Sequence, residues 1–265
     1  MKISVVTASY NQGPFISRCI ESVRREAEDV AVEHIILDSC SVDQTGSILE
    51  EYERSSGTVE LNIIVEKDDG QTGAINRGLA LSTGDVVCWL NTDEWYSPGA
   101  LKAVTEYFSS NPEIDVVFGD CDFFDVNQNL VSARRESFFS FPMLIFYGCF
   151  IPSCSTFVRR RVLEAGIFLD PNYKIIMDTN WYARIHRAGF KFGHLPRVLA
   201  NFTWHDTNIS ANFPERKRIE RRIVADEFGD IPGPRFIKAL AYEGLRRFWQ
   251  ATRVLRRLQR SFSTR

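Results

Sequence analysis

The fold is decided by one stretch of sequence, Gly84-Asp85-Val86-Val87-Cys88-Trp89-Leu90-Asn91-Thr92-Asp93-Glu94-Trp95-Tyr96. Its apolar run at 86–90 is typical of a buried strand, and polar and acidic residues follow it at once. Open α/β sheets bind ligands at the carboxyl ends of such strands. Carboxylates at that position can hold a divalent cation against a phosphate-bearing substrate. The alternative is a strand followed by a helix that Thr92 or Asp93 caps.

Upstream of this stretch, strand patterns alternate with helix patterns. We expect strands at 3–7, 34–37 and 61–65, and helices at 15–23, 45–52, 74–81 and 98–108. This alternation is typical of a parallel sheet with crossover helices. The apolar run at 86–90 is the fourth strand of this series. Because parallel strands end at one edge, the polar residues after the first, second and fourth strands should converge on a nucleotide or phosphate site.

The pattern loosens from residue 114 onward. The aromatic-rich stretch 138–150 is predicted to pack a helix against the sheet. Further strands are expected at 156–159 and 198–202, and further helices at 160–165 and 178–188. Neither an internal repeat nor a low-complexity linker interrupts the sequence.

Composition indicates an ordinary globular chain. It has 265 residues, 44% of them hydrophobic and 25% charged, and a formal net charge of −2, which argues against a general nucleic-acid binder. Six cysteines without a Cys-x-x-Cys pair favour free thiols in a reducing compartment, with a Cys149–Cys154 disulfide as the alternative. The chain begins without a secretory signal and has no apolar run of about 18 residues. We therefore expect a cytoplasmic protein.

The C-terminal tail, residues 231–265, differs in character. Between 234 and 265 there are nine basic residues and one acid, Glu243. The apolar residues of this part fall near one helical stripe: Phe236, Leu240, Leu245, Phe248, Trp249, Leu255 and Leu258. A basic amphipathic helix suits the inner face of an anionic cell membrane as a peripheral contact. A helix that packs on the domain, or on a second subunit of a homodimer, is the alternative.

Five motifs in order identify a family resemblance. They are Val5 to Gln12, Leu37 to Thr45, Glu66 to Gln71, Ala74 to Gly78 and Gly84 to Glu94. The chain resembles the family 2 glycosyltransferases, which have the GT-A fold and use nucleotide-diphosphate sugars. The resemblance implies an α/β, Rossmann-like, mostly parallel sheet flanked by helices. It implies one domain at 1–230, with a nucleotide-sugar half at about 1–120 and an acceptor half at about 121–230.

The resemblance also implies roles for individual residues around the nucleotide. Thr7, Ala8, Ser9 and Tyr10 would line the nucleoside pocket. Asp38 would accept hydrogen bonds from the ribose or base, and capping of the following helix is its alternative role. Asp68 and Gly70 would close over the base, and Asn76, Arg77 and Thr92 would lie beside the nucleotide. Arg77 is also expected to contact the diphosphate, since a guanidinium pairs with phosphate oxygens through two donors.

The metal and the catalytic base follow from the same resemblance. Asp93 occupies the last position of the family's Asp-x-Asp motif and would hold Mg²⁺ or Mn²⁺, while Asn91 replaces the first Asp. Asn91 would supply a neutral oxygen or contact the sugar. His205 is placed like a late histidine that many GT-A enzymes bring to the metal or diphosphate. Asp178 would be the general base of an inverting displacement, and a plain helix cap is its alternative.

The sequence also departs from the family pattern. Ser39 and Cys40 stand where glycine-like residues are usual, and the Gln-x-x-Arg-Trp motif of processive synthases is absent. We therefore expect transfer of a single sugar, with a UDP-sugar favoured, to a glycan or a lipid-linked surface-polysaccharide precursor. A catalytically inactive nucleotide-sugar-binding or scaffolding protein is one alternative. A sugar nucleotidyltransferase is another, although its basic glycine-rich loop is missing after the first strand.

Overall fold

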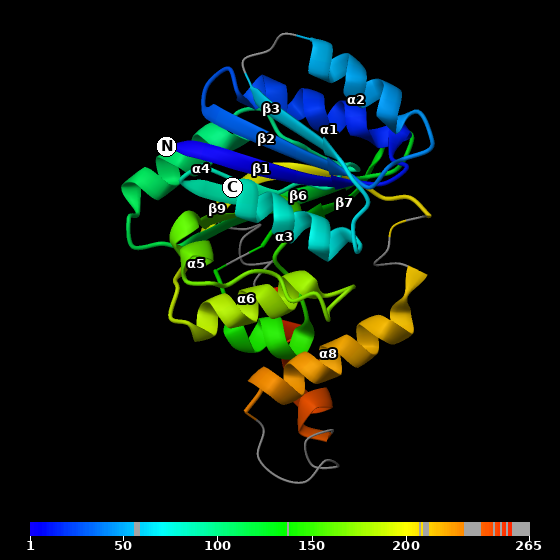
Figure 1. Cartoon of the computed structure of the whole chain (residues 1–265). Helices are drawn as coiled ribbons and strands as arrows, with labels where there is room; N and C mark the ends of the chain where they lie inside the picture. Colours follow the sequence, from blue (N-terminus) through cyan, green and yellow to red (C-terminus); the bar gives the residue numbers. More distant parts are fainter. Residues whose placement is uncertain are drawn as a thin grey trace.

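A computed structural model describes residues 1–55, 59–136, 138–206, 208, 212–230, 240–245, 247–249, 251–252 and 254–255. Its centre is one sheet with the strand order β3-β2-β1-β4-β8-β6-β9-β5, and β7 pairs with β6 at the side. Figure 1 shows α1 and α2 on one face of this sheet and α3, α6 and α8 on the other. The predicted α/β class, with helices on both sides of a sheet, is confirmed.

The first half of the chain builds the parallel part of the sheet. Its elements are β1 (Lys2–Ser9), α1 (Gly13–Glu26), β2 (Ala31–Asp38), α2 (Thr45–Arg54), β3 (Glu60–Val65), α3 (Gln71–Leu81) and β4 (Val86–Trp89). β1 pairs in parallel with both β2 and β4, and β2 pairs in parallel with β3. The carboxyl ends of these strands therefore meet at one edge, as the polar residues after them predicted.

The second half mixes strand directions. Its strands are β5 (Glu94–Tyr96), β6 (Val116–Phe124), β7 (Leu130–Arg134), β8 (Thr156–Arg159) and β9 (Phe192–Thr203). Its helices are α4 (Ala100–Ser110), α5 (Arg160–Glu164), α6 (Met177–Arg187) and α8 (Pro214–Phe228). β8 is antiparallel to both β4 and β6, whereas β6 and β9 are parallel. The long β9 returns to the edge where β4 ends, and this return brings residues beyond 200 to the site.

Two apolar cores hold the layers together because side chains alternate along each strand. Val6 and Trp89 face the core that α3, α6 and α8 cover. Val5 and Cys88, their neighbours in sequence, face the core under α1 and α4. β4 is buried on both sides, so its sequence reads as a continuous apolar run.

The structure corrects the sequence prediction at several segments. Residues after β4 do not start a helix: Glu94 to Tyr96 form β5, which is antiparallel to β9, so the capped-helix alternative is wrong. The helix expected at 138–150 is only a π-helical turn, Met143–Tyr147. The strands β5, β6 and β7 and the helix α8 were not predicted. A three-residue strand, an exposed five-residue strand and a helix with few apolar residues leave a weak periodic signal.

The described part of the tail packs partly on the domain. Tyr242, Leu245 and Trp249 contact the core that α8 covers, whereas Leu240, Phe248 and Leu255 are exposed. Residues 231–239 and 256–265, with most of the predicted basic charge, lie outside the described residues. Among the helices that the structure describes, none is long and apolar enough to cross a membrane. All six cysteines are free thiols, which excludes the Cys149–Cys154 bridge in this structure.

Candidate active site

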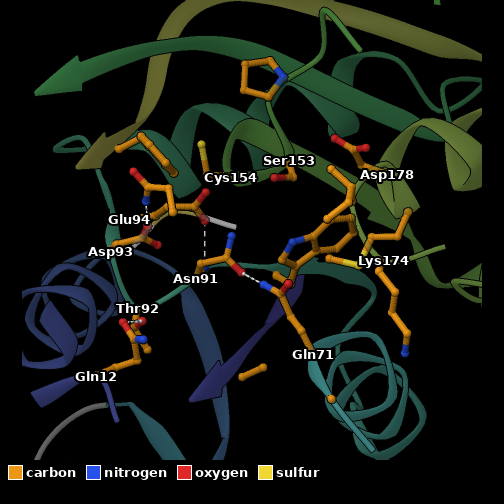
Figure 2. A pocket seen from close by; sticks show the side chains of 18 of the residues that line it. Gln12, Gln71, Asn91, Thr92, Asp93, Glu94, Ser153, Cys154, Lys174 and Asp178 are labelled. Atoms are coloured by element: carbon orange, nitrogen blue, oxygen red, sulfur yellow. Dashed lines mark hydrogen bonds between the residues drawn. The ribbon is translucent and has the colours of Figure 1, made fainter. Parts of the chain in front are cut away.

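A pocket of about 1000 Å³ opens at the carboxyl ends of β1 and β4. The pocket lining has two sides. The strand side comprises Ser9, Trp89, Asn91, Thr92 and Asp93, and the helix side comprises Lys174, Asp178, Lys217 and Arg221. Figure 2 shows Asp93 and Glu94 on one side of the pocket and Lys174 and Asp178 on the other. The helix side comes from α8, from the start of α6 and from the loop before α6, which follow the opening stretch in the second half of the chain.

Asp93 and His205 form the pair of side chains best suited to a divalent cation. Asp93 Oδ2 lies 3.2 Å from His205 Nε2, and both side chains are largely buried. Asn208 holds both: its Nδ2 lies 2.8 Å from that oxygen and 2.9 Å from that nitrogen. Phe15 stacks on the imidazole with the ring centroids 4.6 Å apart. Three segments of the chain, namely α1 and the loops after β4 and β9, thus converge to orient one oxygen and one nitrogen.

These two ligands suit Mg²⁺ or Mn²⁺ only if the substrate completes the coordination. Among the described residues, no cluster of three or more His, Cys, Asp or Glu side chains could hold a metal ion. Magnesium in particular is usually held by one or two carboxylates together with water and substrate phosphates. The donor set therefore fits a cation that binds with a phosphate-bearing ligand.

Asn91 and Thr92 are held in place by neighbouring side chains. The amide of Gln71, at the start of α3, donates to Asn91 Oδ1 at 2.9 Å. Thr92 Oγ1 donates to Gln12 Oε1 at 3.0 Å, which ties the turn after β4 to the loop after β1. The oxygen of Asn91 is engaged by Gln71, and its side chain also hydrogen-bonds to the Glu94 carboxyl group, so one hydrogen of the NH₂ group is left to donate to a ligand. This geometry favours a sugar or phosphate contact for Asn91 over a metal contact.

Glu94 is a buried carboxyl group next to the proposed metal ligand. It is 3% exposed, and Oε2 accepts the backbone N–H of Asn91 at 2.6 Å. Burial raises the pKa of Glu94 well above its usual range, and the nearby Cys154 and Asp93 add to the shift. A carboxyl group that favours its neutral form is a poor cation ligand. Glu94 therefore supports the turn rather than adding a ligand.

The loops after β1 and β3 form the wall next to the strand side. Ala8, Tyr10, Asp68 and Gly70 all line the pocket. Tyr10 is 58% exposed, so its ring is accessible for stacking. Asp68 Oδ1 accepts the N–H of Gly70 at 2.8 Å, and Gly70 has a φ of +102°, which favours glycine. This part of the pocket is apolar and aromatic enough to receive a base.

Four predicted site residues lie outside the pocket lining. Thr7 Oγ1 is buried within 2.9 Å of His34 Nε2, and Asp38 accepts the Ser41 hydroxyl and N–H at 2.6 and 2.8 Å. Asn76 exchanges two hydrogen bonds with the backbone of Leu169. Arg77 forms an ion pair with Glu66 at 2.7 Å. The structure brings together the other predicted residues: Ala8, Ser9, Tyr10, Asp68, Gly70, Asn91, Thr92, Asp93, Asp178 and His205.

Asp178 lies in the first turn of α6 and lines the pocket. Its Oδ1 accepts the N–H of Thr179 at 2.6 Å, whereas the helix-capping position is Ile176. Burial raises the pKa of Asp178 above its usual value, although hydrogen bonds from Cys149 and Thr179 and the positive charge of Lys217 oppose that shift. A carboxylate with a raised pKa is better matched to accepting a proton near neutral pH.

Three polar atoms in the lining lack a protein partner. Ser9 Oγ, Trp89 Nε1 and Arg221 Nε are buried and make no hydrogen bond to the described residues. Buried polar atoms are nearly always satisfied in folded proteins, so each marks a place where a ligand can bind. Trp89 and Arg221 were not predicted as site residues. The signal for Arg221 was its spacing of four from Lys217, which places both on one face of a helix.

Known proteins resemble this chain in sequence and in structure. Residues 4–168 match the model of Glycosyl transferase family 2. An uncharacterized glycosyltransferase of Nostoc sp. is 28% identical over 64% of this chain, a match that spans 55% of that protein. The putative teichuronic acid biosynthesis glycosyltransferase TuaG of Bacillus subtilis is 24% identical, over 79% of this chain and 82% of TuaG.

Solved structures share the fold. S. aureus TarS 1-349 in complex with UDP-GlcNAc has a TM-score of 0.68 and 18% identity, over 90% of this chain and 69% of TarS. The mannosyltransferase PcManGT from Pyrobaculum calidifontis, in complex with GDP-Man and Mn²⁺, has a TM-score of 0.64 and 16% identity. The match covers 94% of this chain and 73% of PcManGT. The predicted GT-A fold is thereby confirmed.

Proposed function

The chain belongs to glycosyl transferase family 2, and we propose that it transfers one sugar, with inversion, from a nucleotide-diphosphate sugar to an acceptor hydroxyl. One observation carries this proposal. Asp93, with its partner His205, lies on one side of a single pocket, and Asp178 lies on the other. An in-line displacement needs the leaving group and the attacking hydroxyl on opposite faces of the anomeric carbon.

In the proposed reaction, Asp178 takes the proton of the acceptor hydroxyl. The acceptor oxygen forms a bond to the anomeric carbon while the bond from that carbon to the diphosphate oxygen breaks. The nucleoside diphosphate leaves with the electron pair, and the configuration inverts. The raised pKa of Asp178 supports this role, since a base works best when its pKa lies near the operating pH.

Asp93 and His205 would hold Mg²⁺ or Mn²⁺, and Asn208 would keep both side chains oriented. A bound cation neutralises charge that develops on the leaving diphosphate. Asn91 and the unpartnered Trp89 indole would donate hydrogen bonds to the donor sugar or its phosphates. Ser9, Tyr10, Asp68 and Gly70 would receive the nucleoside.

The comparisons support a UDP-sugar donor and a role in the cell envelope. The TarS complex contains UDP-GlcNAc, whereas the PcManGT complex contains GDP-Man and Mn²⁺. TuaG is named for teichuronic acid biosynthesis, and a further relative, AmsB of Erwinia amylovora, for amylovoran biosynthesis. We therefore propose a glycan or lipid-linked precursor of a surface polysaccharide as the acceptor, used at the cytoplasmic face of the membrane.

A donor screen tests this function. Thermal unfolding is measured with UDP-, GDP- and dTDP-sugars, each with and without Mn²⁺. At a ligand concentration of 100 times Kd, binding stabilises the folded chain by about 2.7 kcal/mol. We expect one nucleotide to raise the melting temperature, more with Mn²⁺ than without, and the Mn²⁺ increment to vanish in Asp93→Ala. If none of the three donors stabilises the wild-type chain, the proposed function is wrong.

A further inference from the structure

The helix side of the pocket carries three cations that the proposed reaction does not use. Lys174, Lys217 and Arg221 all line the pocket on the side of Asp178. None of the three forms an ion pair with an Asp or Glu of the described chain, since Lys174 contributes only its backbone N–H to Glu220. Lys174 is exposed, whereas Lys217 and Arg221 are partly buried. Partly buried charges without an ion pair are rare in proteins, so the partner of Lys217 and Arg221 is to be sought in a ligand.

The neighbouring cations on α8 show that pairing is available on this helix. Arg216 pairs with Glu220 at 2.8 Å, Arg218 with Glu215 at 2.7 Å, and Arg222 with Asp226 at 3.3 Å. Only Lys217 and Arg221, four residues apart and facing the pocket, lack such partners among the described residues. The cations of α8 outside the pocket are therefore paired with acids of the same helix, whereas the two inside it have no ion-pair partner on α8.

Arg221 is held in a defined position. Its guanidinium packs over Gly148, where an added Cβ atom would lie only 2.8 Å from Nη2. Gly148 has a φ of +118°, so the backbone conformation also favours glycine at this position. The Nε atom of Arg221 is buried without a hydrogen-bond partner in the described chain. A fixed guanidinium with an unused donor can pair with two oxygens of a phosphate or carboxylate.

Lys217 shares this environment with Arg221. Burial lowers the pKa of Lys217, and the charge of Arg221 lowers it further, whereas Asp178 raises it. Two cations this close favour an anion between them, because an anion relieves both their mutual repulsion and their loss of water. Asp178 supplies one negative charge against these two cations, and the diphosphate of the donor is assigned to Asp93 and His205 on the strand side. One positive charge on the helix side is therefore left for a second anionic group.

We propose that Lys217 and Arg221 bind an oxyanion of the acceptor, either a phosphate ester or a carboxylate, next to the hydroxyl that Asp178 deprotonates. This inference rests on the proposed function and narrows its acceptor to an anionic class. Lys174, in the loop before α6, adds a third positive charge at the entrance. Neutral acceptors would leave the Arg221 donor unsatisfied and so bind more weakly.

The test is a titration with three probes of similar size: glucose 1-phosphate, glucuronate and glucose. Calorimetry is run with UDP, GDP or dTDP and Mn²⁺ present, so that the strand side is filled. Two variants carry the same loss of charge on α8: Lys217→Gln with Arg221→Gln inside the pocket, and Arg218→Gln with Arg222→Gln outside it. A third, Lys217→Arg with Arg221→Lys, retains the charge if the first variant fails to fold.

We expect the wild-type chain to bind glucose 1-phosphate or glucuronate more tightly than glucose, and the better of the two identifies the oxyanion. The inner pair of substitutions should weaken that binding by at least about tenfold, as expected for charged hydrogen bonds. The outer pair should leave it unchanged, and the charge-retaining variant should keep most of it.

Three results would overturn the inference: equal affinity for all three probes, equal affinity in the inner and outer variants, or weaker nucleotide binding in the inner variant. The last result would assign the two cations to the donor instead. Nucleotide binding by the wild-type chain is measured in a separate titration. If no nucleotide binds, the proposed function is wrong. If a nucleotide binds but the three probes bind with equal affinity, only the inference about the acceptor is wrong.

Discussion

The two sides of the pocket are built in opposite ways. On the strand side, Asn91, Thr92 and Asp93 are each held by a side chain from elsewhere in the chain, namely Gln71, Gln12 and Asn208. On the helix side, Lys217 and Arg221 have no such partners among the described residues. Hydrogen bonds within the protein preorganise a site before its ligand arrives. The difference indicates that the strand side is preorganised for its ligand. On the helix side, the charges of Lys217 and Arg221 would be paired only by a ligand.

The largest expected effect is that of Asp178→Asn, which breaks the helix side at its reactive group. Transfer should fall by about 10²–10⁴-fold, the usual contribution of a general base, while nucleotide binding with Mn²⁺ stays unchanged. Transfer is measured as the initial rate of nucleoside diphosphate release, and nucleotide binding is measured by thermal shift. Asp226→Asn, on the exposed face of α8, is the matched control and should keep full activity. Full activity in Asp178→Asn itself would remove the base assignment.

Glu220→Gln tests how the helix side is held. The Glu220 carboxylate is 4% exposed and accepts the backbone N–H groups of residues 174–176 and a hydrogen bond from Arg216. Burial raises the pKa of Glu220, but the bonds from Arg216 and these N–H groups outweigh it and lower the pKa. Losing the charge should cost about 1.5–3 kcal/mol of unfolding free energy, measured by urea titration.

The companion control is Glu227→Gln on the same helix. Glu227 is exposed and accepts one hydrogen bond, from the Tyr173 hydroxyl at 3.2 Å. It should change stability by less than about 0.5 kcal/mol, as most surface substitutions do. Equal losses in the two variants would contradict the role of Glu220 in holding the loop before Asp178.

Asn208→Ala tests the strand side in the same way. Asn208 touches both proposed cation ligands, and outer partners of this kind typically contribute 10–100-fold to metal affinity. We therefore expect about 10–100-fold weaker Mn²⁺ binding, measured by titration in the presence of UDP, with metal-free nucleotide binding little changed. Unchanged Mn²⁺ affinity would mean that Asp93 and His205 need no orientation by Asn208.

The smallest expected effect is a pH shift in Lys217→Gln. The positive charge of Lys217 lowers the pKa of Asp178 and partly offsets the rise that burial causes. Removing that charge should raise the pKa of Asp178 further. Because the base acts only when ionised, kcat/KM should then begin to fall at a higher pH on the acid side. A pH–rate profile checks this, with Arg218→Gln as the control that should not shift; a shift to lower pH would contradict it.

The position of a residue was predicted best at the end of a strand. Ser9 is the last residue of β1, Asn91 and Asp93 come just after β4, and parallel strands necessarily place their ends together. The sequence was less informative about which side chains near this edge of the sheet face the pocket. Asp38 and Asn76 occupy family motifs, yet their polar atoms are engaged by Ser41 and the Leu169 backbone. Sequence spacing reports where a residue lies along a strand or helix, but not which neighbour takes its hydrogen bonds.

The sequence by itself determined the α/β fold, the shared edge of β1, β2 and β4, and the candidates Asp93 and Asp178, because local periodicity and ordered motifs encode them. Tertiary structure alone decided that Asn208 orients Asp93, that Glu220 holds the loop before Asp178, and that Lys217 and Arg221 face the pocket. The physical reason is separation along the chain. The hydrogen bonds among them join residues from 44 positions apart, in Ile176–Glu220, to 115 positions apart, in Asp93–Asn208. Only packing of the finished layers brings such residues within hydrogen-bond range.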